Sequence, residues 1–153
     1  MHMAKDCHDT ALRYLEHRAR SVFEIRSHLA AKGFGEEEIE AELRDLKELG
    51  YVSDAEYCRE YIRYGAGKGR GPVRLRRELA EKGIDAGLIR QALEDGFDRQ
   101  TEQEAAMREA GKLIKQGERP DDKTLAKIGR RLHALGYHTE VIYDVIGKVR
   151  RQG

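Results

Sequence analysis

The sequence predicts an all-α fold, made of three tandem three-helix (helix-turn-helix-like) repeats that form an elongated, curved array. Three observations support this prediction. Apolar residues recur at helical spacing, a glycine recurs at the expected end of one helix in each repeat, and no segment alternates convincingly as a strand does. With 39% hydrophobic and 37% charged residues, the composition suits thin helices that each bury a single stripe.

An internal repeat is visible in the chain. Residues 25–34 match residues 75–84 at an offset of 50 positions, with Arg, Leu, Ala, Lys and Gly in register, and a fainter third copy follows after 53 more. Gly33, Gly83 and Gly136 occupy equivalent positions, where a left-handed residue is expected to end a helix. The apolar residue after each glycine is expected to fold back over that helix end: Phe34, Ile84 and Tyr137.

The first repeat is predicted to span residues 11–52, after a flexible N-terminal segment of residues 1–10. Its three helices follow from apolar residues three or four positions apart, because such residues share one face of a helix. The residues of the three faces, in order, are Ala11, Leu12 and Leu15, then Ile25 and Leu29, then Ile39, Leu43 and Leu46.

The second repeat is predicted to span residues 53–96 and the third residues 97–153. Ser53, Asp85 and Thr139 are suited to cap helix N-termini, because their side-chain oxygens can accept hydrogen bonds from backbone N–H groups. The first helix of the third repeat is expected over about residues 97–115. The apolar faces contain Tyr57, Tyr61, Ile62 and Tyr64, then Leu75 and Leu79, then Leu88, Ile89 and Leu93, then Ala106, Ala110, Leu113 and Ile114, then Ile128 and Leu132, and finally Val141, Ile142, Val145 and Ile146.

The formal net charge of +1 conceals an uneven distribution. Residues 36–48 are mainly acidic, whereas residues 59–82 and the stretch from residue 123 onward are mainly basic. Blocks of opposite sign indicate an electrostatic partner for the basic ones, either nucleic acid or an acidic protein groove. The alternative interpretation is a set of solvated helix faces.

The first candidate site leads from a glycine-rich loop into the first turns of a helix. Loop N–H groups, a helix N-terminus and arginine side chains together favour an anion, either DNA phosphate or the carboxylates of a protein groove. Alternatively, Arg74 pairs with Glu78 and Arg77 with Glu81, because the members of each pair are four positions apart on the helix. Arg70 and Arg76 have no obvious partner. We name this set the central basic segment: Lys68, Arg70, Arg74, Arg76 and Arg77.

A second candidate site lies in the last repeat. Cations near a helix C-terminus are favoured by the helix dipole alone, which is the alternative explanation for its last three members. We expect the two basic sites together to contact a partner along the array. We name the second set the terminal basic group: Lys127, Arg130, Arg131, Lys148, Arg150 and Arg151.

Tyr57, Tyr61 and Tyr64 form a stripe at helical spacing, next to two arginines. Aromatic rings between cations can stack on the bases of single-stranded nucleic acid. The alternative is that the stripe belongs to the core, with the hydroxyl groups reaching solvent.

Several functional classes are excluded or disfavoured by the sequence. The glycine-rich run from Gly65 to Gly71 contains no Gly-Lys-Ser/Thr and follows no strand, so we interpret it as a mobile hinge between the first and second units and not as a nucleotide site. The histidines do not converge in the sequence, so no metal and no cofactor are expected.

Cys7 and Cys58 form no disulfide framework, which favours a reducing cytoplasm. No apolar run approaches a membrane span, and no nucleophile has a base beside it, so we expect no membrane association and no enzyme.

Four groups of residues, extending from about Ala11 to Arg150, have a recognisable order and spacing. They are Arg20-Ser21 with Ile25-Arg26, Leu29 and Lys32-Gly33-Phe34, then Leu46 with Leu49-Gly50-Tyr51-Val52-Ser53-Asp54, Tyr57 and Tyr61, then Arg74-Leu75 with Leu79 and Lys82-Gly83-Ile84, and finally Arg130-Arg131-Leu132 with Leu135-Gly136-Tyr137. In this order they resemble the RecX family.

The resemblance implies a regulator of RecA, the recombinase that polymerises on single-stranded DNA. Family members are understood to bind in the helical groove of the RecA filament. We therefore expect a RecX-like monomer that binds the RecA–DNA filament and modulates its extension, ATPase and recombination activities, with inhibition as the expected direction and stabilisation as the alternative. The family offers no catalytic residues to transfer, and its interaction surface is attributed broadly to basic patches.

Two other hypotheses remain open from the sequence. A DNA-binding protein, acting on single- or double-stranded DNA through basic helix-turn-helix-like repeats, should bind without RecA and with a steep salt dependence. A generic helical scaffold is the third hypothesis.

Overall fold

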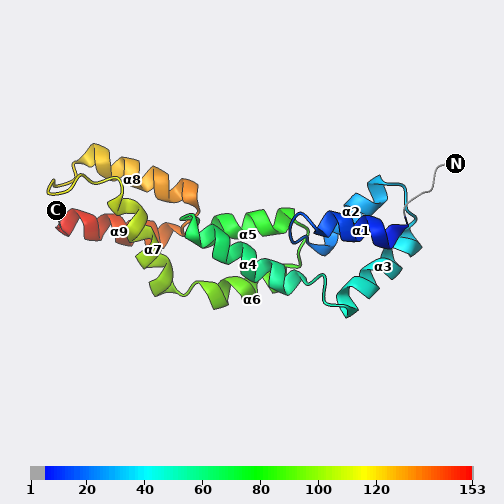
Figure 1. The fold of residues 1–153 in the computed structure, drawn as a ribbon. Helices are drawn as coiled ribbons and strands as arrows, with labels where there is room; N and C mark the ends of the chain where they lie inside the picture. Colours follow the sequence, from blue (N-terminus) through cyan, green and yellow to red (C-terminus); the bar gives the residue numbers. More distant parts are fainter. Residues whose placement is uncertain (1–5, 153) are drawn as a thin grey trace.

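A computed structural model describes residues 6–152, and this part of the chain forms nine α-helices and no strand. The helices form an elongated array, with α1 and α9 at opposite ends (Figure 1). The all-α repeat prediction is confirmed. The helices are α1 (Cys7–Leu15), α2 (Val22–Ala31), α3 (Glu36–Glu48), α4 (Asp54–Gly67), α5 (Pro72–Glu81), α6 (Ala86–Gly96), α7 (Arg99–Gly111), α8 (Asp122–Leu135) and α9 (Thr139–Gln152).

Three separate hydrophobic cores divide the helices into consecutive groups of three, which we call units 1, 2 and 3. The second helix of each unit contributes two apolar side chains, four positions apart, that are completely buried in its core. Burying one such side chain contributes about 1.5–3 kcal/mol. These pairs are Ile25 and Leu29 on α2, Leu75 and Leu79 on α5, and Ile128 and Leu132 on α8.

The helix ends agree with the sequence at most positions. Ser53 and Asp85 cap α4 and α6, as predicted. Thr139 is instead the first helical residue of α9, and the residue before it, His138, accepts a hydrogen bond from the Ile142 N–H at 3.0 Å while its own N–H donates to the Glu102 carboxylate at 2.8 Å. Helix α7 ends at Gly111, four residues before the expected end at 115.

Helix α1 begins at Cys7, and Asp6 caps it by accepting a hydrogen bond from the Asp9 N–H. Residues 7–10, expected to belong to a flexible segment, are therefore helical, and Cys7 is buried in the core of unit 1. The rest of that expected segment, residues 1–5, and the last residue of the chain lie outside the described residues.

Glycine ends the second helix of each unit, as the repeat predicts. Gly33, Gly83 and Gly136 have φ angles of +92°, +74° and +96°, which are left-handed values that glycine adopts without strain. In units 1 and 3 the next residue closes the turn, since the Phe34 N–H donates to the Leu29 carbonyl and the Tyr137 N–H to the Leu132 carbonyl, both at 3.2 Å. Tyr137 then packs into the core, with 3% of its surface exposed.

The units are joined end to end through their second helices. The Gly71 and Val73 N–H groups, at the N-terminus of α5, donate to the carbonyls of Leu135 and Gly136, at the C-terminal end of α8, at 2.7 and 2.9 Å. At the other joint, the hydroxyl of Ser21, before α2, donates to the Lys82 carbonyl at 2.8 Å. Helices α8, α5 and α2 therefore follow one another along the array (Figure 1).

The glycine-rich run is not a hinge between units 1 and 2. Helix α4 continues through Gly65 to Gly67, and the following loop lies within unit 2. The loop is fixed to unit 3, because the Tyr137 hydroxyl donates to the Gly69 carbonyl at 2.7 Å and the Gly71 N–H donates to the Leu135 carbonyl. The hinge prediction is wrong because small residues serve here to let two backbones approach closely.

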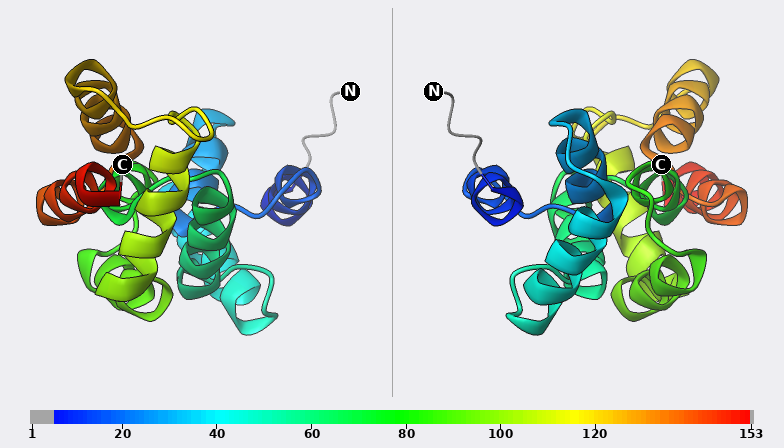
Figure 2. Two further views of the ribbon diagram at one scale, coloured as in Figure 1. Left: turned by 90° about the vertical axis from the view of Figure 1, so that its left-hand side faces the viewer. Right: turned by 90° about the vertical axis from the view of Figure 1, so that its right-hand side faces the viewer.

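Viewed along its length, the array places α1 on one side and the pair α8–α9 on the other (Figure 2). No helix in residues 6–152 is long and apolar enough to cross a membrane.

Candidate partner-binding surface

The central basic segment is only partly free. Arg70 and Arg74, at the start of α5, both approach the carboxylate of Glu78, at 3.6 and 3.3 Å, and their side chains are 25% and 30% exposed. The pair of Arg74 with Glu78 was predicted, whereas Arg70 was expected to lack a partner. Lys68 and Arg70 also lie over the ring of Tyr64, at 5.6 and 5.9 Å from its centre.

The N-terminus of α5 is not an anion site. Its first N–H groups, those of Gly71 and Val73, are bound by the carbonyls at the end of α8. Those carbonyls carry the negative end of the α8 dipole, so the protein itself occupies the position proposed for a phosphate or a carboxylate. The prediction of an anion site at this terminus is therefore wrong, because a neighbouring unit covers it.

Arg76 and Arg77 are the members of the central basic segment that contact neither Glu78 nor the ring of Tyr64. Both are exposed on α5, and neither forms an ion pair within residues 6–152. The ion pair of Arg77 with Glu81, which was the alternative interpretation of this residue from the sequence, is not formed. An exposed, unpaired guanidinium keeps all its donors for a partner, so these two positions are the strongest candidates in unit 2.

The terminal basic group is exposed throughout and forms no ion pair among the described residues. Its first three members are on α8 and the others on α9, and these two helices pack side by side in unit 3 (Figure 1). Lys148 also lines a groove of about 480 Å³ together with Arg108 and Met107 of α7. Arg108 was missed by the sequence analysis, because only the packing of α7 against α9 brings it beside Lys148.

The tyrosine stripe divides between core and surface. Tyr57 is 7% exposed and stacks on Tyr61, with the ring centres 6.0 Å apart. Burial raises the pKa of both phenols. Tyr57 is therefore a core residue and cannot stack on a base, whereas Tyr64 is 59% exposed but lies beneath Lys68 and Arg70.

Two buried carboxylates bind histidine side chains, and neither was singled out from the sequence. Glu102 of α7 binds both the backbone N–H and the ring of His138, and Glu42 of α3 binds the ring of His8 on α1. Each contact ties the first helix of a unit to its third helix or to the residue before it. No sequence signal identifies them, since the partners are 36 and 34 positions apart.

The two cysteines lie in the cores of units 1 and 2. Cys7 and Cys58 are buried and unbridged, and burial raises the pKa of each thiol to about 11. Within residues 6–152, no three His, Cys, Asp or Glu side chains are grouped to hold a metal ion.

An elongated array of three-helix units with exposed cations on α5, α8 and α9 defines a class, the all-helical tandem-repeat proteins. Two family models match the chain: the first three-helix domain of RecX over residues 7–46 and the second three-helix domain over residues 53–93. The chain belongs to the RecX family.

Individual relatives agree with this assignment. The chain is 34% identical over 145 residues to the regulatory protein RecX of Legionella pneumophila, covering 93% of each chain. It is 37% identical over 134 residues to that of Bacillus licheniformis, covering 86% of this chain and 51% of the relative.

Two solved structures share the fold. The crystal structure of RecX from Lactobacillus salivarius superposes with a TM-score of 0.82 at 24% identity, over 94% of both chains. The crystal structure of another regulatory protein RecX gives a TM-score of 0.79 at 26% identity, over 93% of this chain and 71% of that one.

Proposed function

We propose that this protein is a cytoplasmic regulator of RecA that binds the RecA–DNA filament as a monomer and inhibits its extension, its ATPase and its recombination activities. Membership of the RecX family supports the choice of partner. The protein acts by occupying the filament surface and has no reaction of its own to perform.

The observation that carries the proposal is the run of unpaired cations on two helices joined end to end. Arg76 and Arg77 are on α5, and Lys127, Arg130 and Arg131 are on α8. Residues 127–135 of α8 and 72–77 of α5, which hold these cations, are 15 residues and extend over about 22 Å at 1.5 Å per residue. Cations spread over such a length suit an extended anionic partner better than a single small ligand.

The test is the ATPase activity of RecA on single-stranded DNA, with this protein titrated in. We expect inhibition at well below one molecule per RecA, because blocking growth at a filament end affects many protomers. The double variant R76E/R131E should require at least tenfold more protein, since each reversal replaces an attraction with a repulsion.

A matched control is R44E, which reverses an exposed arginine on α3, outside the two basic sites. It should inhibit as the unchanged protein does. Equal inhibition by R76E/R131E and the unchanged protein would exclude these cations as the contact surface. No inhibition by the unchanged protein would overturn the proposed function itself.

DNA binding is the second candidate function, because the same exposed cations suit phosphates. In this case the protein alone should bind a labelled single-stranded oligonucleotide, and the logarithm of its affinity should fall with the logarithm of salt by about 0.7 per phosphate contacted. Tight binding that requires RecA would instead favour the filament regulator.

A further inference from the structure

A groove lies between α7 and α9, the first and third helices of unit 3. Most of its lining comes from α7, at positions 100, 103, 104, 107 and 108, and Lys148 of α9 completes it. Spacings of three and four positions place the α7 residues on one face of that helix, over about 12 Å. The volume of about 480 Å³ is within the range of about 300–1,000 Å³ that is usual for ligand sites.

Met107 gives this groove an apolar surface. Its side chain is half-buried and packs against the core of unit 3, and it also lines the groove. Methionine is flexible and polarisable, so its side chain adapts to the apolar group that it contacts. The hydrocarbon stems of Arg108 and Lys148, which also line the groove, add to this surface. The groove can therefore receive an apolar side chain of a partner.

Two cations from different helices make the groove attractive to an acid. Arg108 and Lys148 are both exposed, and neither forms an ion pair within residues 6–152. The carboxylate in the lining, that of Glu104, is one turn before Arg108 and accepts a hydrogen bond from the Gln100 amide at 3.1 Å. Because two positive charges face one negative charge, the lining is complementary to a single added carboxylate.

Gln103 adds hydrogen-bonding groups that match a peptide backbone. Its side chain is half-buried in the lining and forms no hydrogen bond with any of the described residues. A side-chain amide has both N–H donors and a carbonyl acceptor, as a peptide bond does. A nucleic acid would instead bring closely spaced phosphates, which Glu104 in the same lining would repel. The lining therefore favours a peptide over a polyanion.

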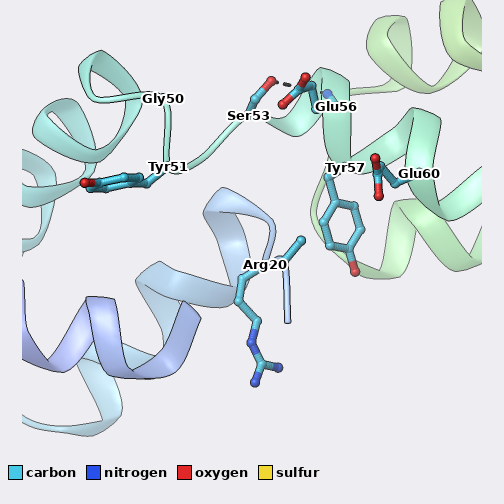
Figure 3. A pocket seen from close by; sticks show the side chains of 8 residues that line it. Arg20, Gly50, Tyr51, Ser53, Glu56, Tyr57 and Glu60 are labelled. Atoms are coloured by element: carbon cyan, nitrogen blue, oxygen red, sulfur yellow. Dashed lines mark hydrogen bonds between the residues drawn. The ribbon is translucent and has the colours of Figure 1, made fainter. Parts of the chain in front are cut away.

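The notch between units 1 and 2, of about 110 Å³, lacks this combination (Figure 3). Figure 3 shows the Tyr51 ring directed away from Glu56 and Glu60, so no aromatic face meets these carboxylates. Both carboxylates already lie 3.9 Å from an arginine, Arg59 or Arg63. In the α7–α9 groove, by contrast, an apolar side chain and unpaired cations belong to one lining.

We propose that the α7–α9 groove binds an acidic peptide segment of a partner protein, with an apolar side chain on Met107 and a neighbouring carboxylate paired with Arg108 and Lys148. Short segments are commonly recognised by a groove that takes an apolar anchor and by polar groups that set their orientation. None of the cations on α5 and α8 that carry the proposed function lines this groove. The proposal therefore does not depend on RecA being the partner.

The test uses the full chain, labelled with ¹⁵N, and the peptide acetyl-Glu-Leu-Glu-Glu-Leu-Glu-amide as the probe. We expect saturable chemical-shift changes centred on the amides of Met107, Arg108 and Lys148. The peptide acetyl-Gln-Leu-Gln-Gln-Leu-Gln-amide has nearly the same shape but no charge, and it should bind about fivefold more weakly. Equal binding of the two peptides, or shifts centred elsewhere, would overturn the proposal.

Variants locate the binding. R108Q/K148Q should weaken binding of the acidic peptide about fivefold, and M107Q should weaken it as well, because each variant removes one half of the recognition. The control R119Q/K123Q removes two exposed cations of unit 3 that do not line the groove, and it should leave binding unchanged. Equal weakening by R108Q/K148Q and R119Q/K123Q would show unspecific attraction and contradict the site.

A competition experiment separates a peptide site from a nucleic-acid site. A single-stranded oligonucleotide should leave the bound peptide in place, because Glu104 lies within the lining. Displacement of the peptide, with shifts of the same amides, would assign the groove to DNA and overturn the proposal. The RecA test relies on cations of α5 and α8, so its outcome is independent of these results.

Discussion

Single residues at the joint between units 2 and 3 show how closely the two backbones approach. A Cβ atom at Gly71 would lie 2.6 Å from the carbonyl oxygen of Gly136, and one at Gly136 would lie 2.2 Å from the Cβ of Arg74. Both contacts are far inside van der Waals range. Glycine is required at Gly71 for space and not for its φ angle, because backbone atoms of the next unit occupy the position of a side chain.

We predict that Gly71→Ala destabilises the protein by about 1–3 kcal/mol, the usual cost of an additional methyl group in a packed site. Urea denaturation followed by circular dichroism measures this. Gly67→Ala is the matched control, because Gly67 is helical and has no atom within 4 Å of its added Cβ. It should be neutral or stabilise by about 0.5–1 kcal/mol. Similar effects at both positions would contradict the close approach of the units.

At the scale of helices, the joint between units 1 and 2 places the N-terminus of α2 against the C-terminal end of α5. Glu24, on the first turn of α2, pairs with Arg18 at 2.9 Å and approaches Lys82 at 3.6 Å. Its carboxylate also accepts a hydrogen bond from the Ser21 N–H, which completes a capping box. One acidic side chain thus caps a helix and links two units.

The pKa of Glu24 predicts how this joint responds to acid. Burial alone would raise the pKa, but the hydrogen bonds from Arg18 and Ser21 and the charge of Lys82 lower it below the ordinary 4.5. A lowered folded-state pKa means that the stabilisation is complete above about pH 4.5 and is lost as the pH falls through the folded-state value.

We therefore expect Glu24→Gln to reduce the free energy of unfolding at pH 7, with the difference from the unchanged protein narrowing as the pH falls below 4.5. Glutamine retains the capping geometry, so the comparison isolates the charge. Denaturation at a series of pH values measures the difference. If the difference in free energy of unfolding between Glu24→Gln and the unchanged protein is the same at pH 7 and pH 3, the Glu24 charge does not stabilise the joint.

At the scale of the whole molecule, the described residues form a single file of units, joined between units 1 and 2 and between units 2 and 3. Gly83 is covered by Phe23 of unit 1 and Gly136 by Arg74 of unit 2, whereas the equivalent Gly33 has no atom of residues 6–152 within 4 Å of an added Cβ. The accessible surface is 10049 Å², against about 7,900 Å² for a compact protein of 17.5 kDa. The large surface for its mass suits a protein that acts by binding.

We predict a radius of gyration clearly above the value of about 15 Å expected for a compact chain of 153 residues. Helices α2, α5 and α8 alone contain 34 residues in line, or about 50 Å. Small-angle X-ray scattering at several concentrations measures this and excludes dimers as the cause. A value near 15 Å would mean that the units fold back on one another in solution.

The sequence by itself determined the features that depend on near neighbours. Helical spacing of apolar residues predicted the all-α repeat, and Gly33, Gly83 and Gly136 marked helix ends, because a left-handed turn is a property of one residue and its adjacent backbone. Ser53 and Asp85 were identified as caps for the same reason, since a cap acts within three positions.

Only the tertiary structure decided which charged and aromatic groups are free. Arg70 was expected to be unpaired, but the fold brings it to Glu78, and the N-terminus of α5 is bound by carbonyls more than 60 positions away, at Leu135 and Gly136. Tyr51 has the sequence context of a residue that folds back, yet its ring is exposed because Val52 fills the core. Such outcomes depend on contacts between units, and no local pattern in the chain encodes which surfaces a neighbouring unit covers.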